Sequence, residues 1–188
     1  MEPVDIELGS LLQEPRRLLT RDLIGPTIYR LAQDRKTREA GQRVVTVVFR
    51  AAPRGRRRKL AFRVTWSCVV LAMKHGYAEV LEDLAKLART KNEDVITELA
   101  ALGLAFLLVT ALLPRDQITK VVPKGGRGDF YLNGRRDQMI EISGTMEGDL
   151  SKRFSEKRQQ ILLNRRLTRA YVNVSRFATP ASRLERVK

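Results

Sequence analysis

The chain has 188 residues, of which 43% are hydrophobic and 30% are charged, and its formal net charge is +15. This length and hydrophobic content are typical of one folded domain, or of a domain with an appendage, and exclude a disordered polar tail. The single cysteine excludes a disulfide framework, and the single histidine leaves no basis for a zinc site built from His and Cys. A lone cysteine is typical of a reduced, cytoplasmic compartment. The positive charge predicts a polyanionic partner, with DNA as the first candidate.

Residues 1–41 have a pattern that predicts helices. An apolar stripe of leucines indicates a first helix, and Gly25-Pro26-Thr27 predicts the start of a second helix because proline is favoured in a first turn. Gly41 is then expected to end that second helix. The whole segment is therefore expected to be helical.

The next segment predicts a β-hairpin with a positively charged tip. Residues 43–50 are rich in β-branched side chains, residues 60–66 alternate between apolar and polar, and a Pro/Gly turn lies between them. The cations that this turn holds in solvent, and that we expect to contact nucleic acid, are Arg54, Arg56, Arg57, Arg58 and Lys59. Residues 69–89 then return to a helical pattern with a break at Gly76.

A long apolar helix is predicted after residue 90. Thr90 and Glu93 have the spacing of a capping box, and Pro114 is expected to stop the helix near Leu113. The apolar run is shorter than the ~20 residues that a bilayer span requires, so we expect a buried helix and no membrane contact. Glu98 places a charge in the first half of this helix.

The remaining chain predicts four strands and one helix. The expected strands cover residues 118–122, 128–132, 138–143 and 170–177, and the expected helix covers residues 150–164. With the apolar helix, the order becomes helix, three strands, helix, strand. We therefore expect an α/β (α+β) fold with a core and a basic C-terminal segment over residues 90–188. The expected N-terminal extension of helices and hairpin covers residues 1–89 and has no assigned function.

Two acids in neighbouring predicted strands stand out in this basic chain. If the apolar faces of the two strands coincide, Asp129 and Glu141 lie together on the opposite face. A loop centred on Arg135 sets the two acids directly opposite each other. A tight turn at Asn133-Gly134 would put the isoleucines on the wrong face, so we reject it. Opposed like charges destabilise a hairpin unless a cation lies between them.

A divalent cation is one way to stabilise this pair. Mg²⁺ prefers carboxylate oxygens, water and phosphate, and Mg²⁺ or Mn²⁺ held here would polarise a phosphodiester and activate a water. The alternative is that nearby arginines neutralise the two acids, namely Arg127, Arg135 and Arg136. The pairing geometry alone leaves both alternatives open.

From about Asn92 to Phe177 the chain resembles the core of the PD-(D/E)xK nuclease superfamily, which has the restriction-endonuclease-like fold. The resemblance rests on the order of elements and on short motifs. "GDF" contains Asp129, "IEIS" contains Glu141, and Glu98 lies on the preceding helix. This resemblance implies an α-β-β-β-α-β core. It also implies a metal site at Asp129 and Glu141, with Glu98 assisting.

One position departs from the family pattern. Ser143 stands where the family has a lysine that orients the attacking water or stabilises developing charge. Either a cation from elsewhere replaces that lysine, with Lys124, Lys152 and Lys157 as candidates, or the fold is kept for binding without cleavage.

The predicted function is binding of DNA and its metal-dependent hydrolysis by a catalytic group that comprises Asp129, Glu141, Ser143 and Glu98. Outside the hairpin tip, the expected phosphate contacts are Lys124, Lys152, Arg153 and Lys157. One alternative is a catalytically inactive nuclease-fold subunit that binds DNA or assembles with partner proteins. Another is a module whose basic face binds an acidic protein. A homodimer or a larger protein complex is the expected assembly.

Overall fold

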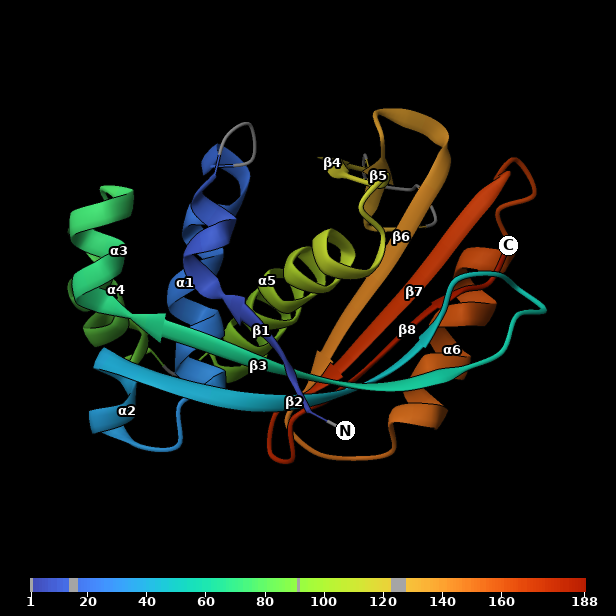
Figure 1. Ribbon diagram of the computed structural model, residues 1–188. Coiled ribbons are helices and arrows are strands. Elements are labelled where there is room, and N and C mark those ends of the chain that lie inside the picture. Colours follow the sequence, from blue (N-terminus) through green and yellow to red (C-terminus); the bar gives the residue numbers. More distant parts are fainter. Residues whose placement is uncertain (1, 14–16, 91, 123–127) are drawn as a thin grey trace.

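The computed structural model describes residues 2–13, 17–90, 92–122 and 128–188. Within these ranges, eight strands form one mixed sheet with the order β1-β3-β2-β8-β7-β6-β5-β4 (Figure 1). The strands are β1 (Val4–Glu7), β2 (Ala40–Arg50), β3 (Arg58–Ser67), β4 (Ile118–Val121), β5 (Phe130–Leu132), β6 (Arg135–Thr145), β7 (Arg169–Arg176) and β8 (Ala181–Arg186). The α-helices are α1 (Arg17–Leu31), α2 (Arg35–Glu39), α3 (Cys68–His75), α4 (Val80–Leu87), α5 (Glu93–Leu112) and α6 (Leu150–Leu162). This arrangement confirms the mixed α/β (α+β) class.

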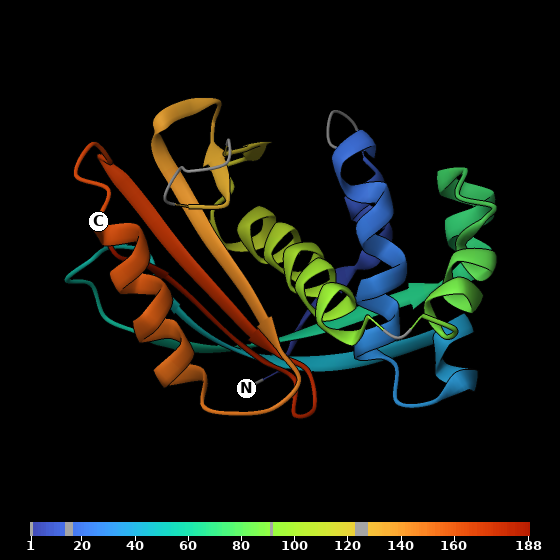
Figure 2. The same cartoon turned by 180° about the vertical axis from the view of Figure 1, so that it is seen from behind.

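Helices cover both faces of the sheet. α5 packs on β6 and β7, α1 packs on α5, and α3 and α4 lie beside α1 on the same side (Figures 1 and 2). α6 lies over the other face, against β6, β7 and β8. Side chains along β6 follow this division, because Ile140 and Ile142 join the core around α5, whereas Met139 joins the cluster around Phe154 of α6. Glu141 therefore points to the α6 face.

The N-terminal segment is less helical than the sequence predicted. Val4–Glu7 forms a strand that pairs in parallel with β3, and Leu8–Leu12 forms a 3-10 helix. Gly41 does not end a helix but lies inside β2. A Cβ at this glycine would come within 2.8 Å of the Trp66 ring, so the residue allows close packing of β2 on β3.

α1 is continuous through the proline that was expected to begin a helix. It runs from Arg17 to Leu31 with Pro26 in its interior, so the predicted start at Gly25-Pro26-Thr27 is wrong. Proline removes a helical N–H, but Ile24 and Ile28 on either side of it are fully buried. Tertiary packing of these side chains outweighs the local preference.

The hairpin predicted between residues 43 and 66 is confirmed by the antiparallel pairing of β2 with β3. The break at Gly76 is also confirmed, because this residue ends α3 with a φ of 65°, a conformation that glycine adopts readily. β2 pairs in parallel with β8, a strand that the sequence did not predict. Strands from residues 1–89 and from residues 90–188 therefore share one sheet.

α5 ends within a residue of its predicted end but has a different cap. The side chain of Asn92 accepts a hydrogen bond from the Val95 N–H, so Asn92 is the N-cap and the expected cap at Thr90 is wrong. By length and composition alone α5 could cross a membrane, but most of it is buried within the protein. This burial confirms the prediction of a core helix.

β5 and β6 have the predicted register without the predicted loop. Phe130 pairs with Ile140, as a loop centred on Arg135 requires. The chain nevertheless turns tightly at Asn133-Gly134, where both residues have positive φ (55° and 70°). An irregularity after Tyr131 places extra residues on the β6 side, so the tight turn and the register coexist. Rejecting this turn was therefore wrong.

From α5 to β7 the elements follow in the predicted order of helix, three strands, helix and strand. β4, β5 and β6 are antiparallel neighbours, and α6 returns the chain so that β7 runs parallel to β6. The segment just before β5, the middle of β6 and the first half of α5 carry the predicted acids. These three segments meet at one edge of the sheet.

Candidate functional site

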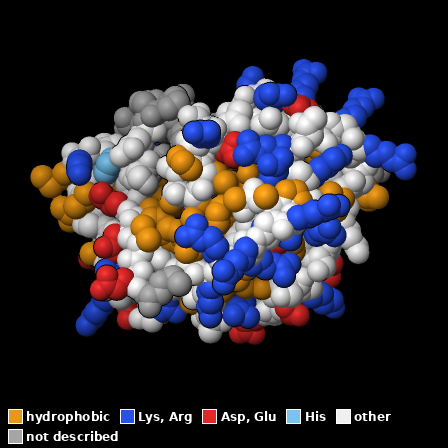
Figure 3. Space-filling view, turned by 45° about the vertical axis from the view of Figure 1, so that its right-hand side comes forward, with side chains coloured by type: hydrophobic (Ala, Val, Ile, Leu, Met, Phe, Trp, Pro, Cys, Tyr) orange, Lys and Arg blue, Asp and Glu red, His pale blue; other side chains and the backbone are white. Residues whose placement is uncertain are grey.

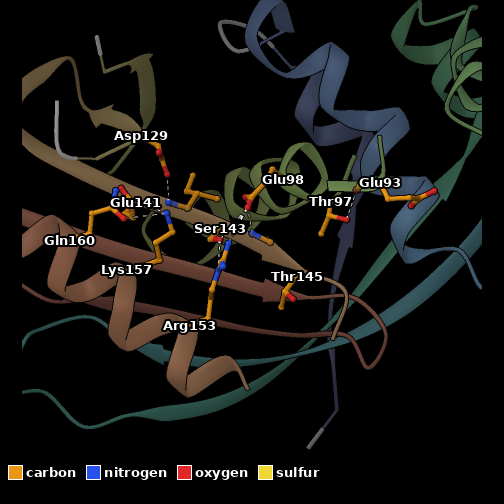
Figure 4. Close-up of polar contacts among 12 residues, drawn as sticks. Glu93, Thr97, Glu98, Asp129, Glu141, Ser143, Thr145, Arg153, Lys157 and Gln160 are labelled. Carbon is orange, nitrogen blue, oxygen red and sulfur yellow. Dashed lines mark hydrogen bonds and ion pairs between the residues drawn. The ribbon is translucent and has the colours of Figure 1, made fainter. Parts of the chain in front are cut away.

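The candidate site lies where β6 loses its neighbouring strand. β5 is short, and its last pairing with β6 is between Phe130 and Ile140. Beyond this point, carboxylates take the place of strand partners. The Ile142 N–H donates to Oδ2 of Asp129 at 2.7 Å, and the Gly144 N–H donates to Oε2 of Glu98 at 2.9 Å (Figure 4). Two of the predicted acids are thereby fixed along one strand edge.

Glu141 is the buried member of the group. Its side chain has no exposed surface, and its Oε1 accepts a hydrogen bond from Lys157 Nζ at 2.7 Å. The other oxygen, Oε2, is buried and has no hydrogen-bond partner among the described residues. Burial raises the pKa of Glu141 against the opposing effect of Lys157, and the negative charges of Asp129 and Glu98 raise it further. A buried carboxylate oxygen without a partner is energetically costly and is a vacant ligand for a cation.

Asp129 is half-buried beside this glutamate. Its Oδ2 is held by the Ile142 N–H, and no hydrogen bond is shown for Oδ1 within the described residues. Burial raises the pKa of Asp129, while the Ile142 hydrogen bond and the charge of Lys157 act in the opposite direction. The same lysine therefore acts electrostatically on both predicted metal ligands.

Ser143 links the third acid to α6. Its hydroxyl lies 3.3 Å from Oε1 of Glu98 and accepts a hydrogen bond from Nε of Arg153 at 3.0 Å. The guanidinium of Arg153 also reaches Oε1 of Glu98 at 3.5 Å. The position at which the family pattern expects a lysine is thus in contact with an arginine from another element.

Among the described residues, α6 supplies two cations that contact the acids of the site. Arg153 and Lys157 are four residues apart, so their side chains leave the same flank of the helix. Both residues were predicted from the sequence as phosphate contacts, and Lys157 also as a candidate replacement for the lysine. The sequence prediction has one gap at this point. It did not foresee the contact between Arg153 and Ser143, for which the four-residue spacing on α6 was the available signal.

The other predicted cations lie away from the carboxylates. The hairpin residues are exposed, and Arg57 among them donates to Oε1 of Glu185 at 2.8 Å. Lys152 is exposed on α6, and Lys124 lies outside the described residues. Arginines were the alternative to a metal for neutralising Asp129 and Glu141. Arg135 does not do so, because its guanidinium pairs with Asp137.

A cavity of about 500 Å³ opens beside the carboxylates, between the start of α5 and the end of β6. Glu98 and Arg153 contribute to its wall, together with Glu93, Asp94 and Glu147. The sequence analysis did not select these last three acids as site residues. The cavity reaches the end of the site at Glu98 and Gly144, whereas Asp129 and Glu141 do not line it.

The carboxylate oxygens of the site determine which kind of metal ion it could hold. Within the described ranges, no group of three or more His, Cys, Asp or Glu side chains is gathered closely enough to hold a metal. Two carboxylate oxygens are nevertheless without hydrogen bonds there, Oδ1 of Asp129 and Oε2 of Glu141. A pair of carboxylates that leaves the other positions to water and phosphate is how proteins usually hold Mg²⁺. The residues therefore fit a magnesium ion better than a metal with an all-protein ligand cage.

Comparisons of the chain with protein-family models, with curated proteins and with solved structures find no match. The chemistry of the site accordingly rests on its own geometry.

Proposed function

We propose that the protein is a metal-dependent phosphodiesterase that cleaves DNA, with its active centre at the edge of β6. The observation that carries this proposal is the buried carboxylate of Glu141. One of its oxygens has no partner among the described residues, and the group lies beside Asp129 and pairs with a cation from α6. The net charge of +15 also favours a substrate with repeated phosphates, because it attracts a polyanion to the molecule.

The order of elements supports a relationship to the PD-(D/E)xK nucleases. α5, the three strands β4 to β6, α6 and β7 follow the order of that core, with acids just before β5, on β6 and on the helix. We propose the restriction-endonuclease-like fold for this part of the chain on these grounds. The two-part division at residues 89 and 90, the cytoplasmic location and the homodimer or larger complex stay predictions.

The site residues divide the chemistry among them. Asp129 and Glu141 would hold Mg²⁺ or Mn²⁺. The ion would polarise the phosphodiester and lower the pKa of a water bound to it. Lys157 provides the positive charge that the motif lacks at Ser143, because its ammonium group lies against the same glutamate. Arg153 is placed to contact a phosphate oxygen, and Glu98 orients its guanidinium.

A second candidate function has an observation in its favour. Lys157 and Arg153 are both paired with site carboxylates, so each cation partly neutralises an acid that a metal would use. A nuclease fold that binds DNA without cleaving it would keep such a neutralised site. This alternative predicts DNA binding that weakens with salt and no cleavage with any divalent cation.

Cleavage assays separate the two candidates. Plasmid and single-stranded DNA are incubated with Mg²⁺ or Mn²⁺ and the wild type, Asp129→Asn, Glu141→Gln or Asp137→Asn. The last variant is a matched control, because Asp137 is an acid of β6 that pairs with Arg135 outside the site. We expect metal-dependent cleavage that falls by more than about 100-fold in the two site variants and persists in the control. DNA binding without cleavage by the wild type would favour the inactive subunit.

A further inference from the structure

α6 forms a ridge on the sheet, with a different charged cluster on each side of it. The strands beneath it align four residues in one row, since Arg50 pairs with Glu185, Glu185 with Val172, and Val172 with Glu141. Neighbouring strands lie ~4.8 Å apart, so the two glutamates are separated by about 10 Å across the base of the ridge. The carboxylate site occupies one side, and Glu185 occupies the other.

Glu185 gathers arginines on its side of α6. Its side chain is completely buried, and it contacts guanidinium groups of Arg57 at 2.8 Å, Arg183 at 2.7 Å and Arg50 at 2.5 Å. Three arginines around one carboxylate leave a net positive charge of two. The guanidinium of Arg183 also stacks 3.9 Å above the ring of Phe154, which fixes this arginine cluster against α6.

The hairpin extends the arginine cluster into solvent. Arg57 itself keeps about half of its side chain exposed (56%), and the neighbouring cations Arg54, Arg56, Arg58 and Lys59 are exposed. Figure 3 shows Lys and Arg side chains spread over this side of the molecule. The exposed large hydrophobic residues of the described chain lie outside the hairpin tip. A protein–protein interface would normally place apolar side chains at its centre, so this surface fits phosphates better than an acidic protein.

The crest of the ridge carries polar side chains that can contact base edges. Lys152, Glu156 and Gln159 are exposed and lie on the face of α6 opposite the buried Phe154. An α-helix with its side chains is about 10–12 Å across, and the major groove of B-form DNA is about 12 Å wide. A helix of these dimensions separates two phosphate backbones when it enters that groove.

We propose that α6 enters the major groove of duplex DNA, with the carboxylate site against one strand and the arginine cluster against the other. The choice of DNA rests on the proposed function, whereas the docking geometry rests on the two flanks of α6. In this arrangement Arg57, Arg183 and the hairpin tip anchor the uncleaved strand. The duplex contacts both flanks at once, so anchoring by the arginine cluster sets which phosphate lies at the carboxylate site.

The anchoring surface is tested with metal-free protein. Binding of a fluorescent 20-base-pair duplex is followed by anisotropy in EDTA at several salt concentrations. We compare Arg54→Ala/Arg56→Ala with a control that removes the same charge from the α2–α4 end of the molecule, Arg35→Ala/Arg89→Ala. The hairpin variant is expected to bind roughly 10-fold more weakly, with a salt slope smaller by about 1.8, since each lost phosphate contact removes about 0.9. Equal losses in both variants would overturn the proposal.

The groove is tested by competition and by a second duplex. The major-groove ligand methyl green is expected to displace the protein, and the minor-groove ligand netropsin is not. An RNA duplex of equal length is expected to bind at least about 10-fold more weakly, because its major groove is too narrow for a helix. Displacement by netropsin alone, or equal affinity for the RNA duplex, would contradict entry of α6 into the major groove.

These measurements can fail independently of the cleavage assay. Duplex binding that depends on the hairpin, without cleavage by any variant, would refute the proposed hydrolysis and support the docking geometry. Metal-dependent cleavage, with equal duplex binding by the hairpin variant and its control, would support the proposed hydrolysis and refute the docking geometry.

Discussion

Asp129 illustrates the cost of burying a carboxylate without a full set of partners. Its folded-state pKa is raised by burial, so the folded protein holds a proton on this group more readily than the unfolded chain does. The contribution of this group to stability is therefore lost as pH rises from the unfolded pKa, about 4, through the raised folded pKa. At neutral pH the charged aspartate destabilises the metal-free fold.

Replacing this aspartate by asparagine should raise the stability of the metal-free protein. Asp129→Asn keeps an oxygen for the Ile142 N–H and removes the buried charge. We expect a higher melting temperature than wild type at pH 7 in EDTA, and a smaller difference near pH 4. Adding Mg²⁺ should stabilise the wild type and leave the variant unchanged. A variant that is less stable than wild type in EDTA at pH 7 would contradict this account.

Replacing Lys157 should lower both the stability of the fold and the rate of cleavage. Lys157→Met keeps most of the apolar stem of the side chain but leaves Glu141 buried without its ion pair. We expect the free energy of unfolding, measured with urea in EDTA, to fall by about 3 kcal/mol. Mg²⁺ should recover part of this loss because the metal compensates the carboxylate, while cleavage stays at least about 100-fold below wild type.

The neighbouring residue provides the control for the lysine variant. Arg158 is exposed on α6, and Arg158→Met removes the same charge without touching the site. Its unfolding free energy should stay within about 0.5 kcal/mol of wild type. Equal losses for the two variants would show that the Lys157–Glu141 pair has no special role.

At the level of elements, α1 and α5 cross at a position that only glycine allows. A Cβ on Gly103 would lie 2.1 Å from Oγ1 of Thr27 and 3.2 Å from the Leu23 carbonyl oxygen. Gly103→Ala should lower the free energy of unfolding by about 2 kcal/mol, because one of the two helices must shift. Adding Thr27→Ala removes the closest atom, so the double variant should recover part of the loss in urea titrations. No recovery would place the strain elsewhere.

The elements that the sequence predicted well are those with local signals. The alternation in residues 43–50 and 60–66 located the hairpin, and the unbroken apolar run located α5. The register of β5 with β6 followed from face alternation, which also brought Asp129 and Glu141 into one site. The turn at Asn133-Gly134 was missed because the irregularity after Tyr131 has no signature of its own in the sequence.

Contacts between distant segments account for what the sequence did not predict. β1 and β8 are short and acquire their strand character by pairing with β3, β2 and β7. Likewise, the Arg153–Ser143 contact depends on how α6 packs over β6, which periodicity alone does not give. The three acids on β6 and its neighbours and the two cations of α6 could be named from the sequence, but which acid each cation pairs with required the tertiary structure.

On the scale of the whole molecule, Glu185 connects the hairpin, β8 and α6. Its buried carboxylate holds Arg50 and Arg57 from the hairpin and Arg183 beside α6. Glu185→Gln removes the charge that compensates three guanidinium groups, so we expect a loss of about 3 kcal/mol in the free energy of unfolding by urea. The loss should shrink when Arg50→Met is added, because one fewer guanidinium then lacks a counter-charge. Unchanged stability in the single variant would refute this role.

The carboxylates at the edge of β6 also affect self-association. A strand edge with unpaired N–H groups is a template on which another chain can add a strand. Asp129 and Glu98 occupy the N–H groups of Ile142 and Gly144, so this edge is closed by side chains where β5 stops. Asp129 and Glu98 thus occupy backbone groups that an added strand would need, and they do so whether or not the protein cleaves a phosphodiester.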